Sequence, residues 1–253
     1  MPSEQFAEFS ATSFTVNDAD TLIRVLDAAR RANARLFISF TGNQENFQDS
    51  AGGFDIAKWK QRVDRFRGVD LTPYIADETI AGHLLLDEPY DKSNWNGKPV
   101  SQQDIEELAR YSKEIWPSMV TVLRTHYDYL EGSQYPHLDA VRIQYHSRFG
   151  SLDDYIAAHV AVAKSLGQAV IGGVNLLDGG TEASGIPGKR EGKFAMSAQE
   201  LRSWGRRFLT DPNICAFIMY QYDSAYLARP DIQAAMAELS EVARSIPKKA
   251  CRR

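Results

Sequence analysis

The sequence has few cysteines, no long apolar run and no strong excess of either charge. Its 253 residues carry a net charge of −4, and the 29 basic residues are scattered, apart from the KKACRR near the end. A nucleic-acid-binding surface needs clustered Lys and Arg, so we expect no nucleic-acid partner. No apolar run approaches the roughly 18 residues of a membrane span, so we expect no membrane association. The opening MPSEQFAEFS shows neither the basic nor the apolar region of a signal peptide.

The two cysteines form no recognisable metal or redox motif. No Cys-x-x-Cys pair or Cys/His zinc spacing occurs in the chain. Cys215 lies in the apolar run CAFIMY, where a cysteine is usually a small core residue, and Cys251 lies in the tail. We therefore expect no disulfide between them, no bound metal and no cofactor.

Short apolar runs rich in β-forming residues alternate with segments of helical spacing. This alternation predicts right-handed β-α-β units and a parallel sheet. No linker or change in composition divides the chain, so we expect one domain over residues 1–253, in a monomer. The predicted strands are 6–11, 35–40, 83–88, 119–124, 140–146, 169–177 and 215–222.

Serine residues mark the beginnings of three predicted helices. Ser101, Ser151 and Ser197 each stand three residues before an acidic residue, the spacing at which a serine oxygen accepts a free helical N–H. Gly167 follows AVAKSL and predicts a helix end.

Two architectures fit the alternation, an open doubly wound sheet and a closed barrel. An open nucleotide-binding sheet carries a glycine-rich turn after an early strand, but the loop after RLFISF reads TGNQENF. The later loop DGGTEASGIPG also lacks the Lys-Ser/Thr ending of a phosphate-binding loop. The sequence therefore predicts an α/β fold of the (β/α)8 TIM-barrel type. Only seven strands are clear, so the eighth is either missed or absent.

Polar side chains follow five of the predicted strands at their carboxyl ends, where the active sites of parallel barrels lie. Such a gathering suits a polar substrate, although strands commonly end where polar loops begin. The residues are Asp87, Glu88, Arg124, His126, Gln144, His146, Asn175, Asp178, Gln221 and Asp223.

Asp87 and Glu88 are adjacent at the end of one strand. Side chains alternate between the two faces of a regular strand, so only one of these carboxyls can face the barrel axis. We take Glu88 as that residue and Asp87 as its hydrogen-bonding support. Asp178, three strands further along, is the candidate for the second carboxyl.

Two carboxyls beside a pocket suit cleavage of a glycosidic bond, in which one protonates the leaving oxygen and the other attacks carbon or activates water. Aromatic side chains can stack on sugar rings, and polar side chains can bind sugar hydroxyls. The candidates for these contacts are Tyr90, Trp95, Tyr127, Tyr145, Tyr222, Arg124, Gln144 and Asn175.

The segments IAGHLLLDEPYD, YSKEIWPSM and NLLDGGTEASGIPGK resemble barrel proteins of the glycoside-hydrolase-like TIM-barrel superfamily, over nearly the whole chain. This resemblance implies a carbohydrate-related role, with Glu88 as general acid/base and Asp178 as nucleophile or base. It also favours an extracellular location. Two departures stand out: many such hydrolases have Asn-Glu where this chain has Asp87-Glu88, and the last strand offers Gln221 instead of a carboxylate.

Simpler interpretations compete with these assignments. Glu88 could form a structural ion pair with Arg124, and Asp178 could make a turn before Gly179-Gly180. His126 and His146 could be rim residues. Two other functions also stay open: a metal-dependent sugar isomerase or epimerase with ligands from Glu88, His126, His146 and Asp178, and a carbohydrate-binding barrel without catalysis.

Overall fold

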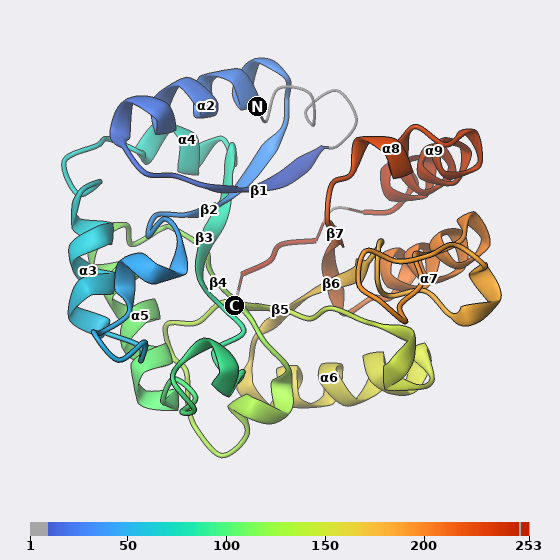
Figure 1. Ribbon diagram of the computed structural model, residues 1–253. Helices are drawn as coiled ribbons and strands as arrows, with labels where there is room; N and C mark the ends of the chain where they lie inside the picture. The colour runs from blue at the N-terminus through green and yellow to red at the C-terminus, as the bar shows by residue number, and fades with distance from the viewer. Residues whose placement is uncertain (1–9, 248, 253) are drawn as a thin grey trace. The chain divides into compact units, whose positions relative to one another are not determined.

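A seven-stranded sheet organises the protein, and its strands follow one another in chain order, β1-β2-β3-β4-β5-β6-β7. The computed structural model describes residues 10–247 and 249–252, and Figure 1 labels their helices and strands. Within this part of the chain no eighth strand is present. The strands are β1 (Ala11–Thr15), β2 (Arg35–Ser39), β3 (Ile80–Asp87), β4 (Thr121–Arg124), β5 (Ala140–Arg142), β6 (Ala169–Asn175) and β7 (Ile214–Tyr220).

Helices separate the strands in the β/α alternation that the sequence predicts, except between β4 and β5, where the described chain forms only the 3-10 turn η3. None of the described helices is long and apolar enough to cross a membrane. The α-helices are α2 (Ala19–Arg31), α3 (Ile56–Asp64), α4 (Thr72–Ala76), α5 (Gln102–Ile115), α6 (Leu152–Leu166), α7 (Ala198–Thr210), α8 (Ser224–Leu227) and α9 (Pro230–Ser245). Short 3-10 turns are η1 (Gln44–Phe47), η2 (Lys92–Asn94), η3 (Tyr127–Leu130), η4 (Ser147–Phe149) and η5 (Glu182–Ser184).

The predicted helix ends are confirmed. The hydroxyls of Ser101, Ser151 and Ser197 accept hydrogen bonds from backbone N–H groups three residues on, at the starts of α5, α6 and α7. Glu200 completes a reciprocal capping box with Ser197. Gly167 ends α6 in the left-handed conformation.

The chain divides into two compact units. The first holds the described residues up to Thr125 together with Gly132–Ala140. Its strands β1, β2, β3 and β4 pair in parallel, each with the next. Its core contains His83, which is fully buried between the rings of Phe40, Trp59 and Trp116.

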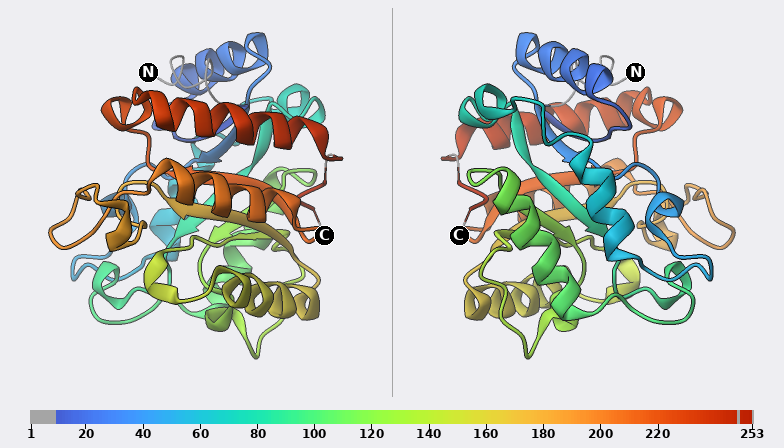
Figure 2. Two further views of the ribbon diagram at one scale, coloured as in Figure 1. Left: turned by 90° about the vertical axis from the view of Figure 1, so that its right-hand side faces the viewer. Right: turned by 90° about the vertical axis from the view of Figure 1, so that its left-hand side faces the viewer.

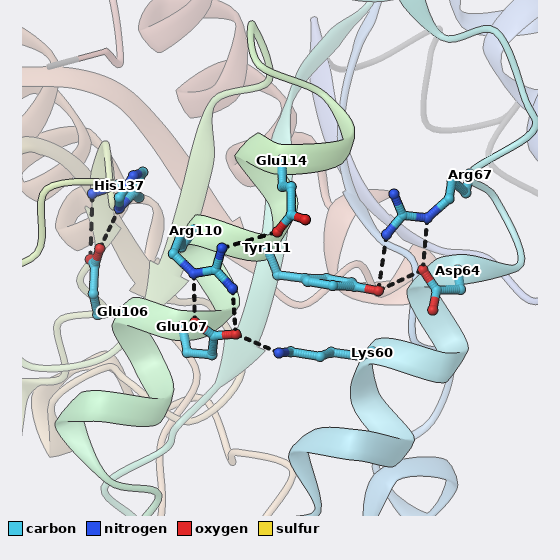
Figure 3. A network of polar contacts seen from close by, with 9 residues as sticks. All are labelled: Lys60, Asp64, Arg67, Glu106, Glu107, Arg110, Tyr111, Glu114 and His137. Atoms are coloured by element: carbon cyan, nitrogen blue, oxygen red, sulfur yellow. Dashed lines mark hydrogen bonds and ion pairs between the residues drawn. The ribbon is translucent and has the colours of Figure 1, made fainter.

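Helices α3 and α5 of the first unit are joined by a polar network on their outer surface (Figure 3). Glu107 accepts hydrogen bonds from Arg110 and from Lys60 of the other helix. The Tyr111 hydroxyl donates to Asp64 over 2.7 Å. The network therefore connects residues of the two helices that are 47 positions apart in the sequence.

The second unit holds His126–Glu131 and the described residues from Val141 onward. Strands β6 and β7 pair in parallel, and the backbone N–H groups of Ile143 and Tyr145 donate to carbonyls of β6. Helices α7 and α9 lie side by side, as the left view of Figure 2 shows. Gly205 permits this packing, because a Cβ there would come within 2.5 Å of Leu239.

The predicted position of the first strand is wrong. The strand begins at Ala11, where the prediction ends, and residues 6–9 of the prediction lie outside the described residues. Two local features account for the shift. The segment ATSFT is rich in β-branched and aromatic residues, and Asp18 caps α2, which leaves only a short connection between strand and helix.

The prediction that Cys215 and Cys251 remain unpaired is also wrong. They form a disulfide with a Cα–Cα distance of 5.3 Å. The tail after α9 returns to the amino end of β7, where the Lys249 ammonium donates to the Asp211 and Ile214 carbonyls. Distance along the sequence gave no sign of this return, which depends on the tertiary packing.

Candidate functional site

In the first unit, three charged side chains meet at the carboxyl ends of β3 and β4. Arg124 Nη1 lies 2.7 Å from Asp87 Oδ1 and 3.1 Å from Glu88 Oε1. The Arg124 side chain is 13% exposed. Its burial opposes the charge, but the neighbouring carboxylates of Asp87 and Glu88 outweigh that effect and raise the pKa of the guanidinium. Arg124 therefore stays charged and connects the two acids.

Glu88 has a strained backbone. Its φ is +46°, a left-handed value that is uncommon for a residue with a Cβ. Side-chain alternation ends here, so both acids reach the same guanidinium, which regular β-geometry would prevent. The prediction that only one acid faces inward assumed a regular strand up to Glu88, whereas β3 ends at Asp87.

The polar groups of Glu88 are held at several points. Its N–H donates to the Arg124 carbonyl, and its own carbonyl accepts from Asp91 N–H and Trp95 Nε1. Carboxyl Oε1 accepts from Arg124 and from the Tyr90 hydroxyl, which is 3.1 Å away. Among the described residues no hydrogen-bond partner is found for Oε2. One carboxyl oxygen of a fixed, 32% exposed side chain thus remains available.

The Tyr90 hydroxyl is a hydrogen-bond donor to the Glu88 carboxylate. Burial and the adjacent Glu88 carboxylate raise the pKa of the Tyr90 hydroxyl. The hydroxyl therefore keeps its proton across the physiological range.

Trp95 does not present a free ring face. It is 1% exposed and packs against Phe47 and Phe54, with ring centroids 6.0 and 5.6 Å away. Its indole N–H donates to the Glu88 carbonyl. We therefore assign Trp95 to the support of Glu88 and not to the stacking on sugar that its loop position suggests.

In the second unit, Asp178 lies three residues after the end of β6. Its Oδ1 accepts a hydrogen bond of 2.9 Å from the Arg190 backbone N–H, and Oδ2 is 3.7 Å from Arg190 Nε. The turn that precedes Asp178 is made by Asn175, whose Oδ1 accepts from the backbone N–H groups of Leu177 and Asp178. The predicted turn-forming role thus belongs to Asn175, which is 5% exposed.

Gln144 and His146 lie beyond β5 and are within 3.5 Å of each other through their Nε2 atoms. Gln144 is 6% exposed, and its Oε1 is buried with no hydrogen-bond partner in the described structure. A buried acceptor without a donor is a costly arrangement unless another molecule supplies one.

His126 and His146 both lie against the ring of Phe149, at centroid distances of 5.2 and 5.6 Å. His126 also contacts His159, whose burial lowers the pKa of its imidazole. The histidines therefore belong to an aromatic cluster over η4 and α6. Among the described residues, no group of three or more His, Cys, Asp and Glu side chains is arranged to hold a metal ion.

Gln221 and Tyr222 follow β7, which ends two residues earlier than predicted. Both are partly exposed, and the peptide bond between Tyr220 and Gln221 is cis. Tyr220, which is 42% exposed at the end of the strand, is not among the residues predicted from the sequence. Arg190 is not among them either, because nothing in the spacing indicates that the chain returns to Asp178 after twelve residues.

The structure therefore gathers Asp87, Glu88, Tyr90, Arg124 and the Trp95 indole in the first unit. In the second unit it gathers Gln144 with His146, and Asn175 with Asp178.

No protein-family model matches this chain, and no curated protein does. Solved structures match its fold. A β-1,4-mannanase matches with a TM-score of 0.59 and 12% identity, over 97% of this chain and 91% of that protein. A cellulase in complex with an inhibitor also gives 0.59 at 12% identity, over 95% and 85% of the two chains.

A xylanase from Thermoanaerobacterium saccharolyticum matches with a TM-score of 0.50 and 16% identity, over 94% of this chain and 78% of that protein. These neighbours are glycoside hydrolases, and the likeness covers nearly the whole chain. It confirms the predicted TIM-barrel fold and its likeness to the folds of glycoside hydrolases.

Proposed function

We propose that the protein is a glycoside hydrolase that cleaves an oligo- or polysaccharide, with Glu88 as general acid/base and Asp178 as nucleophile or base. The glycosidase-like fold supports the reaction class. The positions of Glu88 after β3 and Asp178 after β6 support the assignment, since strand-end residues carry catalysis in such barrels.

The observation that carries the proposal is the state of Glu88. A left-handed backbone costs on the order of 1–3 kcal/mol for a residue with a side chain, and such strain gathers at functional sites. Here the strained residue is a carboxylate fixed by Arg124, Tyr90 and Trp95, with Oε2 left over. A residue that only capped a helix would need neither the strain nor this degree of support.

The chemistry follows from these contacts. Arg124 and Tyr90 hold Oε1, so the proton that a general acid gives to the leaving oxygen would be carried by Oε2. Asp178 would attack the anomeric carbon or activate water, with its Oδ1 held by the Arg190 N–H. Asp87 binds the same guanidinium nitrogen of Arg124 as Glu88 and so helps to fix the position of Arg124.

Substrate hydroxyls need donors and acceptors, and aromatic rings suit the apolar faces of sugars. The buried Oε1 of Gln144 is a suitable acceptor for one hydroxyl. We propose the same kind of contact for the remaining strand-end residues, which are His126, His146, Asn175, Gln221 and Tyr222. We add Tyr220 for its exposed ring. An extracellular location fits a glycan-degrading role and the disulfide, which persists in oxidising compartments.

The test is a screen of a glycan panel with the wild type and Glu88→Gln. The amide keeps the size of the side chain but cannot donate or accept the catalytic proton, so we expect kcat/KM to fall by about 10³-fold or more. Glycan binding, measured by affinity electrophoresis, should stay within about twofold of the wild type.

Asp87→Asn is the matched control, because it alters the other acid on Arg124. We expect a much smaller loss for this variant. Equal activity of Glu88→Gln and the wild type would contradict the assignment. Loss of wild-type activity with a chelator would favour the metal-dependent isomerase or epimerase, and binding without any cleavage would favour a carbohydrate-binding barrel. The anomeric form of the first product, followed by NMR, distinguishes retention from inversion.

A further inference from the structure

The second unit carries a long hairpin between β6 and α7 with a basic tip. We call residues 178–196 the basic hairpin; in the left view of Figure 2 it is the orange loop that projects beyond the start of α7. Its tip reads KREGK, and Lys189, Arg190 and Lys193 are all exposed. Glu191 lies between these cations, so residues 189–193 carry a net charge of +2, and with Asp178 and Glu182 the whole hairpin is neutral; its positive charge is confined to the tip.

Backbone hydrogen bonds give the basic hairpin a defined shape. Gly188 N–H donates to the Lys193 carbonyl over 2.7 Å, and Gly180 N–H donates to the Phe194 carbonyl over 2.9 Å. Gly188 permits the close approach, because a Cβ there would lie 2.7 Å from the carbonyl oxygens of Leu177 and Lys193. The three cations are therefore presented on a structured loop and not on a free tail.

The base of the hairpin is anchored beside the strand ends. The Ser147 hydroxyl of η4 donates to the Gly180 carbonyl over 2.7 Å, and Arg190 N–H holds Asp178. Arg190 is the only hairpin cation with an ion-pair partner in the described structure, and its contact with Asp178 is 3.7 Å long. The ammonium groups of Lys189 and Lys193 have no carboxylate within ion-pair distance among the described residues.

We infer that the basic hairpin binds the negative groups of an acidic glycan, so that the substrate is a carboxylated or sulfated saccharide. This inference rests on the proposed function, because it identifies the hairpin as part of the surface that meets the substrate. Positive charge on a fixed loop next to a strand-end site attracts anionic ligands and speeds their association. Neutral glycans gain nothing from these cations.

The experiment uses the full chain and three polymers with one backbone: dextran, carboxymethyl-dextran and dextran sulfate. We expect retardation of the protein in affinity electrophoresis by at least one charged polymer and not by dextran, with weakening as salt is raised. Retardation by carboxymethyl-dextran alone assigns a carboxylated glycan, and retardation by dextran sulfate alone assigns a sulfated one.

The variant is Lys189→Gln/Lys193→Gln, which leaves Arg190 and Asp178 untouched. Solvent screens exposed charges, so we expect affinity for the charged polymer to fall only roughly fivefold. Arg31→Gln/Lys164→Gln removes the same charge from exposed positions on α2 and α6 and should bind like the wild type. The inference would be overturned if the two double variants lost affinity equally, or if Lys189→Gln/Lys193→Gln lost none. Binding of double-stranded DNA by the wild type as tightly as the charged polymer would also overturn it.

The two proposals fail separately. Cleavage of a neutral glycan that depends on Glu88, without binding to charged polymers, would overturn the acidic-glycan inference and leave the glycosidase standing. Hairpin-dependent binding to charged dextran without cleavage of any glycan would do the opposite.

Discussion

His83 is an ionisable residue inside an apolar core. Its ring is fully buried against Trp59, and Nδ1 is 2.8 Å from the Ser112 hydroxyl. Burial lowers the pKa of the imidazole from 6.5 to about 3. The folded protein therefore keeps His83 neutral at pH values where the unfolded chain binds a proton.

This difference makes stability depend on pH. The unfolded state binds a proton at His83 more readily than the folded state does. The free energy of unfolding therefore decreases as pH falls below 6.5 toward 3. Between pH 7.5 and pH 5 we expect His83 to lower the free energy of unfolding by about 2 kcal/mol. Urea unfolding of the wild type and of His83→Gln at pH 7.5 and pH 5 measures this decrease. An equal decrease in the free energy of unfolding of the two proteins would contradict the assignment to His83.

At the residue scale, part of the candidate site could be predicted from the sequence. Asp87 and Glu88 were identified from their position after an apolar run, because strand ends are visible in composition. The left-handed φ of Glu88 was not predictable, because it depends on Arg124, Tyr90 and Trp95 meeting in the folded chain. Arg190 was missed for the same reason.

At the scale of elements, the contact between α3 and α5 depends on Glu107. Arg110 and Lys60 both bind its carboxylate, and with Arg110 as the main cause the pKa of Glu107 falls to about 2. The group is partly exposed, so solvent screens much of this interaction.

The folded-state pKa of Glu107 is depressed, so its stabilising effect is complete above pH 4.5 and is lost as pH falls toward 2. We expect Glu107→Gln to lower the free energy of unfolding at pH 7 by about 1 kcal/mol and to have little effect near pH 2. Glu114→Gln is the control, since the ion pair of Glu114 in the described part of the chain is with Arg110 of its own helix. Chemical denaturation at the two pH values checks both; equal effects at both would contradict the argument.

Among the features of the secondary structure, the starts of helices were the most predictable. A serine cap acts within three residues, so Ser101, Ser151 and Ser197 could be identified without knowledge of the fold. The first strand was misplaced even though ATSFT is rich in β-branched and aromatic residues. Its pairing with β2, from Ala11 opposite Arg35 onward, fixes the register, and that pairing is a tertiary contact.

At the scale of the whole molecule, the Cys215–Cys251 disulfide closes a loop that contains β7, α8 and α9. Closing a loop with a sequence separation of 36 residues restricts the unfolded chain by an amount equivalent to about 4 kcal/mol in the chain-entropy description. The tail is fixed in addition by Lys249, which donates to the Asp211 carbonyl before β7 and to the Ile214 carbonyl at its first residue.

We expect a dithiol reductant to lower the thermal midpoint of the wild type by about 10 °C. Cys215→Ser/Cys251→Ser should unfold at the lower temperature with or without reductant, which calorimetry can measure. Alkylation before and after reduction should modify no thiol and two thiols, respectively. A reductant effect of the same size on the double variant would show that the shift has another cause.

The order of the strands has a consequence for how the chain folds. Ala11 pairs with Arg35, His83 with Thr121, and Val170 with Ile214, so each strand finds its partner a few tens of residues away. Loop closure over such separations costs less than closure between distant parts of the chain, so pairing between consecutive strands keeps the contact order low for a parallel sheet. During synthesis, β1 to β4 can pair before the later strands leave the ribosome, so the sheet can grow one strand at a time in the direction of translation.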